Sequence, residues 1–365
     1  MDANKLLAIV CVSEMLMESS SSSEDSEEDD NKKIFALASV IRETHPRQTG
    51  YLSVIMEYSN SDFWRHFRVS QATFNYLLRF MEKNKFRSEI TYYGGYEPLS
   101  NSEVLLITLQ YLGNQGAIRL LADKFDRTES SIWNAIEWVC NFLFKHQSCF
   151  IKWPVETEMP YIASKFKDKC GFPGVVGAID GCHIPFHPLF ADQKSYRNYK
   201  KFHSFVIMAI VLYDGTFSYV FSEFPGSSHD SYIFHRSSLY NKLNNRCSSM
   251  FNPRRYHIIG DSAFPIQQWC LTPYKKGTNG ITRSQRTFNF KLSATRMVVE
   301  HSFGELKNRF RRCQNVYAKI DKAVNVVVSS CVLHNICIQK GDINRESYCH
   351  IPLHCNVIPN HCDQR

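Results

Sequence analysis

The sequence predicts an α/β domain preceded by an all-helical domain. Three observations lead to this prediction. Apolar residues recur at helical spacings up to about residue 150, short apolar strand-like runs follow Trp153-Pro154, and acidic residues stand where several of these runs end. With 365 residues the chain is long enough for two domains, each with a core.

Charge is distributed unevenly along the chain. The net charge is +8, although the segment from Glu24 to Asp30 alone holds six acidic residues. Leaving those six charges out gives +14 for the remainder, and a body that basic favours a polyanionic partner. The alternative is that these basic residues form a solvated surface without such a partner. The 44% of apolar residues is ordinary for a globular protein and excludes no class.

The first 50 residues are expected to be a disordered leader. Residues 19–30 contain only serine and acids, which cannot bury apolar area. The run from Leu6 to Val12 lacks a basic flank and a cleavage site, so we expect no secretion signal. The thirteen cysteines are scattered without a CxxC pair, which favours reduced thiols in an intracellular protein. The longest apolar run near the strands, Phe205–Tyr213, is too short to span a bilayer.

Residues 51–150 are expected to form the helical domain. An amphipathic pattern runs from Asp62 to Lys83 with a break at Ser70, which is expected to cap the second part. Ser100 or Asn101 is expected to cap the next helix. The glycine pair Gly94-Gly95 between them indicates a loop.

The segment from Ile118 to Ile136 fits a helix-turn-helix. Ala122 is small enough for two helices to cross, and Thr128 can cap the second helix. The turn has Asp126 instead of the usual glycine. Such helix pairs also occur without DNA, so DNA reading and plain helical packing are both open.

The strand order predicts a ribonuclease H-like core over residues 151–338. A buried strand is expected to end at Asp180, and a helix is expected to begin around Asp230. Two further strands, Phe205–Tyr213 and Phe217–Phe224, are expected to be joined by a turn at Asp214-Gly215. A fourth strand, Tyr256–Asp261, is expected to end at its aspartate. The helix at Asp230 is expected to run to Leu243.

A long helix near Thr295–Arg311 supplies one more acid. Its buried stripe is expected to consist of Val299, Phe303, Leu306 and Phe310. Glu300 lies beside this stripe, in line with Gly304, Lys307 and Arg311. Glu305 points elsewhere and can pair with Arg309 four residues on, so Glu300 is the better site candidate.

Four acids are therefore expected to converge: Asp180, Asp230, Asp261 and Glu300. Two like charges about 4 Å apart repel by roughly 4 kcal/mol at an effective dielectric near 20, so the cluster must bind a cation or take up protons. Oxygen ligands favour Mg²⁺ or Mn²⁺, and two such ions can cleave a phosphodiester. The sequence predicts catalytic roles for Asp180, Asp261 and Glu300 and a metal site formed by all four.

Each of these acids also has a structural alternative. Asp180 and Asp261 can be turn residues, and Asp230 can be a helix cap. Glu300 can form an ion pair with Arg296. These alternatives are open from the residues alone.

Basic and aromatic residues alternate between Lys194 and Phe202. This combination suits a nucleic-acid backbone with bases nearby, although a basic hairpin tip would look the same. The residues expected to contact DNA phosphates are Arg197, Lys200, Lys201, Lys307 and Arg311.

Five ordered motifs resemble the PIF/Harbinger transposases and the host nucleases derived from them. The motifs are Gly177–His183, Pro225–Asp230, Gly260–Pro265, Leu271–Tyr274 and Arg296–Phe310, and Val332–Asn335 fits the closing helix of that family. The resemblance covers about residues 170–338 and, more loosely, 60–150. Cys182 and Phe264 depart from the residues common in the family without removing an acid.

The resemblance implies a metal-dependent DDE endonuclease of the ribonuclease H-like fold, with nuclear DNA as substrate and the four acids as metal ligands. It also implies a separate Myb-like DNA-binding partner, and leaves a cytoplasmic pool and a homo-oligomer open. The alternative function is a catalytically silent DNA- or chromatin-binding protein. The tail, 339–365, is expected to be disordered. Its Cys/His pairs match no zinc signature, and a zinc site there is the alternative.

Overall fold

The computed structural model describes residues 46–88, 98–189, 192–277 and 280–342. The predictions for the acidic leader up to residue 45, for the Gly94-Gly95 loop and for the Cys/His tail from residue 343 lie outside the described residues. The described residues from Thr49 onward fall into one compact unit. The predicted boundary near residue 150 between a helical and a nuclease domain stays a prediction.

The described chain begins with helices. These are α3 (Tyr51–Met56), α4 (Asn60–Phe67), α5 (Gln71–Lys83), α6 (Asn101–Gly113), α7 (Ile118–Phe125) and α8 (Glu129–Lys145). Ser70 caps α5 by accepting a hydrogen bond from the Thr73 amide, as predicted. Ser100 caps α6, and Glu103 completes the capping box. Helix α6 is buried on every side from Val104 onward and is therefore the centre of this group of helices.

The predicted turn between α7 and α8 is present. Asp126 takes the left-handed conformation (φ 53°) that glycine usually supplies, which short polar side chains tolerate. Thr128 caps α8 through the Ser131 amide. Helix α8 also packs against α14 (Ile320–Gln339), where Ser329 donates to the Cys140 carbonyl. This packing accounts for the apolar positions of α8, and DNA reading by the pair stays a prediction.

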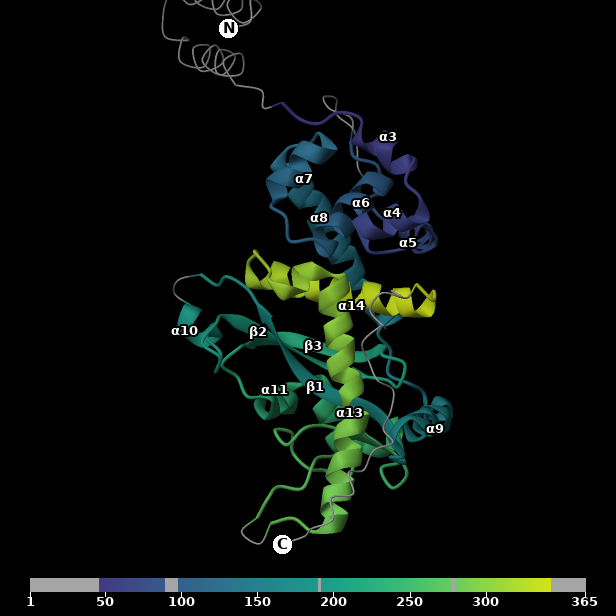
Figure 1. Cartoon of the computed structure of the whole chain (residues 1–365), viewed down its shortest axis with the longest axis vertical. Helices are drawn as coiled ribbons and strands as arrows, with labels where there is room; N and C mark the ends of the chain where they lie inside the picture. Colours follow the sequence, from purple (N-terminus) through teal and green to yellow (C-terminus); the bar gives the residue numbers. More distant parts are fainter. Residues whose placement is uncertain (1–45, 89–97, 190–191, 278–279, 343–365) are drawn as a thin grey trace, which may run out of the picture. The chain divides into compact units, whose positions relative to one another are not determined.

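The second half of the chain forms a mixed five-stranded sheet, which confirms the predicted α/β class. Its order is β3-β2-β1-β4-β5, with β1–β2 and β2–β3 antiparallel and β1–β4 and β4–β5 parallel (Figure 1). The strands are β1 (Val175–Pro185), β2 (Ser204–Val211), β3 (Phe217–Pro225), β4 (His257–Ile259) and β5 (Cys270–Leu271). Strand β5 has two residues, too few to give an alternating pattern in the sequence.

Two predicted elements have different ends. Strand β1 does not stop at Asp180, because Gly181 to Pro185 continue to pair with β2. The helix predicted from Asp230 to Leu243 is divided into α11 (Asp230–Arg236) and α12 (Ser238–Met250). Ser237 causes the division, since its hydroxyl accepts a hydrogen bond from the Tyr240 amide and starts a new helix.

Helix α13 (Arg283–Arg309) crosses the sheet and contacts β1 and β2 (Figure 1). It begins well before the predicted start at Thr295, because Thr282 and Gln285 form a capping box. The four residues of the predicted stripe, Val299, Phe303, Leu306 and Phe310, are all buried. Helix α14 then closes the fold, and Asn335 bonds both backbone polar groups of Phe217. The shorter elements are η1 (Gln147–Cys149), η2 (Glu156–Glu158), α9 (Met159–Cys170), α10 (Gln193–Tyr196) and η4 (Arg311–Gln314).

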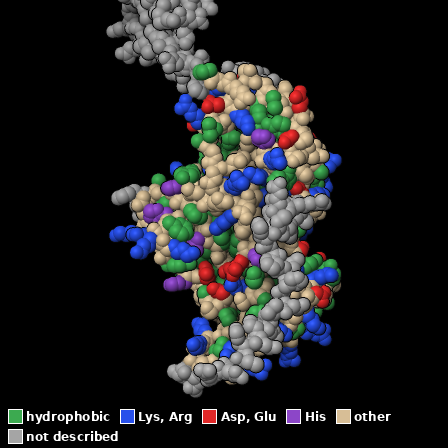
Figure 2. Space-filling model, viewed as in Figure 1, with side chains coloured by type: hydrophobic (Ala, Val, Ile, Leu, Met, Phe, Trp, Pro, Cys, Tyr) green, Lys and Arg blue, Asp and Glu red, His purple; other side chains and the backbone are tan. Residues whose placement is uncertain are grey.

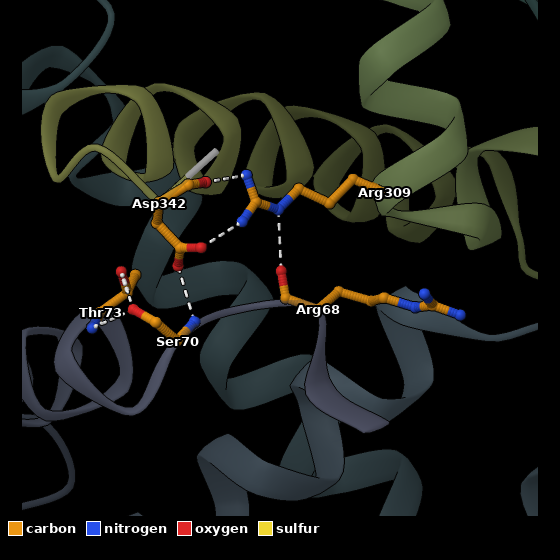
Figure 3. Close-up of polar contacts among 5 residues, drawn as sticks. All are labelled: Arg68, Ser70, Thr73, Arg309 and Asp342. Carbon is orange, nitrogen blue, oxygen red and sulfur yellow. Dashed lines mark hydrogen bonds and ion pairs between the residues drawn. The ribbon is translucent and has the colours of Figure 1, made fainter. Parts of the chain in front are cut away.

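A buried ion pair joins three distant segments of the chain. Arg309, at the end of α13, pairs with Asp342 just beyond α14 (2.7 Å) and also donates to the Arg68 carbonyl (2.8 Å) (Figure 3). The other Asp342 oxygen accepts from the Ser70 amide at the start of α5. The pairing of Arg309 with Glu305 that the sequence allows is not a direct ion pair among the described residues, although burial raises the pKa of Glu305 and the Arg309 charge opposes this rise.

Within the described ranges, no helix has the length and apolarity required to cross a membrane. Seven described cysteines, from Cys140 to Cys337, are free thiols. Five of them are buried.

Candidate active site

Asp180 and Asp261 lie at the same end of the pairing between the parallel strands β1 and β4. The last pair of residues is Ala178 and Ile259; Asp180 lies two residues further along β1, and Asp261 lies two residues beyond the end of β4. A Cβ at Gly260 would lie 2.9 Å from the Phe264 ring and 3.0 Å from Ile179, so glycine is needed for this approach. The sequence prediction that these two acids come from adjacent strands is thus confirmed, although β1 continues beyond Asp180.

Asp261 is also a turn residue, the alternative considered for it. One carboxylate oxygen accepts a hydrogen bond from the Ala263 amide (2.9 Å). The other oxygen has no hydrogen bond to any residue that the structure describes. The turn therefore fixes the orientation of Asp261 and leaves half of its carboxylate available.

Asp230 is the first residue of α11 but does not cap it. The capping position is His229, without a side-chain bond. The Asp230 carboxylate instead lies against Gly181 of β1, where a Cβ would collide with it. Helix α11 thus carries Asp230 to the residue that follows Asp180, and Gly181 provides the space.

These aspartates influence one another electrostatically. Burial raises the pKa of Asp180 to about 6, the charge of Arg296 opposes the rise, and Asp261 and Asp230 add to it. Burial and the charge of Asp261 also raise the pKa of Asp230. The structure therefore brings together three predicted acids, and their mutual repulsion favours a cation or a proton between them.

Glu300 joins this group through an arginine. Arg296 donates to Asp180 (2.8 Å) and to Glu300, one turn further along α13. The alternative in which Glu300 pairs with Arg296 therefore holds in this structure. The Glu300 side chain is 49% exposed, against 17% for Asp180, so it lies at the rim of the group. Sequence reasoning anticipated the Arg296–Glu300 spacing but not the bridge to Asp180.

The motifs imply that these acids bind a metal. Among described residues, no three or more His, Cys, Asp or Glu side chains are arranged so that they could hold a metal ion. The donor set is nevertheless entirely carboxylate, and Arg296 offsets the charge of the partly buried Asp180. Carboxylates in such numbers suit a hard divalent cation such as Mg²⁺ or Mn²⁺. The residues fit the metal by chemistry, and the Arg296 guanidinium occupies a cation's place between Asp180 and Glu300.

The predicted DNA-contacting residues lie in two places. Lys307 donates to the His183 carbonyl (2.8 Å), so it is fixed against β1 three residues beyond Asp180. Arg197, Lys200 and Lys201 are exposed on the loop after α10, and Arg311 is exposed just after α13. In Figure 2 acidic side chains gather where Figure 1 places β1, α11 and α13, and basic side chains lie on the same face over α10.

A small hydrogen-bond network positions the basic loop. The Ser204 hydroxyl contacts His183 Nδ1 (3.0 Å) and accepts from Asn198 (2.9 Å), and the Asn198 oxygen accepts from the Phe202 amide. Burial, Lys307 and Lys200 lower the pKa of His183, which indicates that both lysine charges lie near it. The loop is thereby tied to the strand that carries Asp180. No sequence pattern predicted this network, because its members are far apart in the chain.

Comparison with known proteins agrees with the motifs. Residues 179–335 match the family described as DDE superfamily endonuclease. The chain is 28% identical over 229 residues to the protein named "Putative nuclease HARBI1" of Homo sapiens, which covers 60% of this chain. It is 27% identical over 295 residues to "Protein ALP1-like" of Arabidopsis thaliana, 76% of this chain.

The matched part of this chain spans 62% of the length of the human relative and 70% of that of the Arabidopsis relative. No solved structure matches the chain. The matched residues 179–335 include Asp180, Asp230, Asp261 and Glu300. Residues 179–335 thus resemble a DDE superfamily endonuclease domain, and the chain is similar to the proteins named HARBI1 and ALP1-like, in agreement with its motifs.

Proposed function

We propose that this protein is a metal-dependent DNA endonuclease with a ribonuclease H-like core. The sheet order supports the fold assignment: three antiparallel strands are followed, after two helices, by a strand that lies parallel to the first. The family match and the name of the human relative support the reaction class. The basic remainder of the chain supports a nucleic-acid substrate.

This proposal rests mainly on three acids that lie together: Asp180 from β1, Asp230 from α11 and Asp261 from the end of β4. Three acids that repel one another are unfavourable for folding, so a structure that holds them together needs a compensating role. Glu300 and Arg296 approach the same place from α13. The silent DNA-binding alternative gives no reason for keeping all four acids.

Asp180, Asp261 and Glu300 are proposed as the catalytic acids, with Asp230 as an additional metal ligand. Bound Mg²⁺ or Mn²⁺ would supply an activated water and charge stabilisation at the leaving oxygen of a phosphodiester. Gly181 and Gly260 let the aspartates approach, and the Ala263 amide orients Asp261. Arg296 would have to give up one of its two carboxylates when a metal binds.

The DNA backbone is proposed to cross the face that carries the acids and the basic loop. Arg197, Lys200 and Lys201 would contact phosphates there, and Arg311 would extend this contact along the end of α13. Lys307 donates one N–H to the His183 carbonyl and would offer its remaining N–H groups to a phosphate. From the resemblance alone, we extend the proposal to nuclear DNA as the substrate and to a Myb-like protein as a partner.

The proposal is tested by incubating supercoiled plasmid with the purified chain. We expect nicked circles in Mg²⁺ or Mn²⁺ and none in EDTA. The Asp261→Asn variant should leave the plasmid intact under all conditions. Nicking that continues at an equal rate in EDTA would refute a metal-dependent mechanism.

A further inference from the structure

A cavity of about 220 Å³ lies apart from the acidic site, between α6, α7 and η4. A single buried water needs roughly 10–15 Å³ of such space, so the cavity can hold a ligand of several heavy atoms. Its walls combine apolar residues of α7, among them Leu120 and Leu121, with five polar side chains. These five are Gln110, Tyr111, Asn114, Lys124 and Arg312.

Two cations on this cavity have no acidic partner. Arg312 is only 3% exposed, donates to the Gly116 carbonyl (2.7 Å) and lies 4.2 Å from the centre of the Tyr111 ring. Lys124 lies 4.3 Å from the centre of the Tyr51 ring. Neither forms an ion pair within the part of the chain that the structure describes. Buried charges are normally paired, so Arg312 indicates a missing anion, and the partly buried Lys124 adds a second positive charge at the same cavity.

Two residues that line the same cavity also have buried polar atoms without partners. The Tyr111 hydroxyl and the Gln110 carbonyl oxygen have no hydrogen bond among the described residues, and these residues are 2% and 7% exposed. More than nine in ten buried polar groups in proteins are satisfied. A hydroxyl that can donate and an oxygen that can accept, beside two unpaired cations, form a prepared binding site.

The charges select the class of ligand. A carboxylate would neutralise only one of the two cations, whereas a phosphate monoester carries about −1.5 to −2 charges at neutral pH. Phosphate oxygens also accept hydrogen bonds from a guanidinium and from a hydroxyl. The apolar side chains of Leu120 and Leu121 fit the organic part of an ester, and Gln110 can accept from a hydroxyl group on it.

We propose that this cavity binds a small phosphate monoester, with the phosphate between Arg312, Lys124 and the Tyr111 hydroxyl. The proposal does not depend on nuclease activity. Arg312 lies in η4, three residues after the end of α13, and Gly116 directly precedes the Ala117 cap of α7. A ligand in the cavity would therefore stabilise the packing of α6 and α7 against the end of α13, the helix that carries Glu300.

The test uses the full chain and calorimetric titration with inorganic phosphate and with glycerol 1-phosphate, at constant ionic strength against chloride. Tyr111→Phe removes only an oxygen that has no partner, so this variant should fold. Lys124→Gln removes one cation. Arg119→Gln changes an exposed charge on the same helix and is the matched control. Thermal unfolding of each variant verifies folding.

We expect saturable binding of both phosphates by the parent and by Arg119→Gln. Because a hydrogen bond to a charged group contributes roughly 1.5–3 kcal/mol, Tyr111→Phe and Lys124→Gln should each lose at least about tenfold in affinity. Absence of saturable binding, or equal affinity in all four proteins, would overturn the proposal. If Tyr111→Phe weakens duplex DNA binding but not ester binding, the cavity instead takes a backbone phosphodiester and the monoester proposal is wrong.

Discussion

Replacing Asp180 with Asn should stabilise the metal-free protein while abolishing cleavage. Burial raises the pKa of Asp180 from an ordinary 3.8 to about 6. Because each tenfold difference in proton affinity corresponds to about 1.4 kcal/mol, the ionised carboxylate destabilises the fold by about 3 kcal/mol. The side chain is 17% exposed, so solvent screening removes little of this effect. A neutral amide of the same shape avoids this destabilisation.

The pH dependence has a definite sign. The folded protein binds the Asp180 proton more tightly than the unfolded chain does, so its contribution to stability is present below pH 3.8. This contribution is lost as the pH rises through 6, and above that pH the stability no longer depends on Asp180 protonation. The gain from Asp180→Asn should therefore be about 3 kcal/mol at pH 8, about half of that at pH 5, and absent below pH 3.8.

The assay is urea unfolding at pH 5 and pH 8 in EDTA, with and without added Mg²⁺. Asp168→Asn, an exposed acid on α9, makes the same charge change and should alter stability little at either pH. Mg²⁺ should raise the stability of the parent and leave Asp180→Asn unchanged. Equal unfolding midpoints for parent and Asp180→Asn at pH 8 would refute the reasoning that repulsion and burial strain this site.

Three further predictions concern other parts of the structure. Gly181→Ala should displace the Asp230 carboxylate, lowering plasmid nicking by about a hundredfold with little loss of stability, because only the end of a side chain has to move. Lys200→Ala should weaken DNA binding at all sequences and reduce the salt slope by about 0.9, measured by fluorescence anisotropy over a salt series. Arg309→Ala should lower the free energy of unfolding by about 3–5 kcal/mol, because it leaves the buried Asp342 carboxylate unpaired.

Each of these predictions has a matched control. Gly277→Ala introduces a methyl group into open space and should leave nicking unchanged. Lys83→Ala removes an exposed charge on α5 and should not change the salt slope. Adding Asp342→Asn to Arg309→Ala should recover part of the lost stability, since no buried charge is then left. Normal nicking by Gly181→Ala, an unchanged slope for Lys200→Ala, or full stability of Arg309→Ala would contradict the respective prediction.

Much of the fold could be predicted because residues close together in the sequence determine many of its helices and strands. Ser70, Ser100 and Thr128 cap helices three residues upstream of the amides they bind, and the apolar runs on either side of Asp214-Gly215 mark the β2–β3 hairpin. Element ends were harder, because they depend on pairing partners. Strand β1 continues past Asp180 only because β2 is there to pair with it.

The acids of the candidate site could be predicted from the sequence, but the ion pairs that link them could not. Asp180 and Asp261 follow apolar runs, and that pattern predicts acids at the ends of neighbouring strands. The bridge from Arg296 to Asp180 depends on how α13 lies across β1, and no local spacing encodes that crossing. The same reason explains why the Arg309–Asp342 pair was missed: its partners meet only after α13 and α14 have packed.

Asp180 of β1 and Asp261, two residues beyond β4, are proposed to form a metal-dependent cleavage site. The decisive experiment is single-turnover cleavage of plasmid DNA in Mg²⁺ by the parent, Asp180→Asn, Asp261→Asn and Asp168→Asn, with DNA affinity measured in EDTA. We expect cleavage by the parent and Asp168→Asn alone, at equal DNA affinity in all four proteins. Cleavage by Asp180→Asn and Asp261→Asn at the rate of the parent would contradict this proposal.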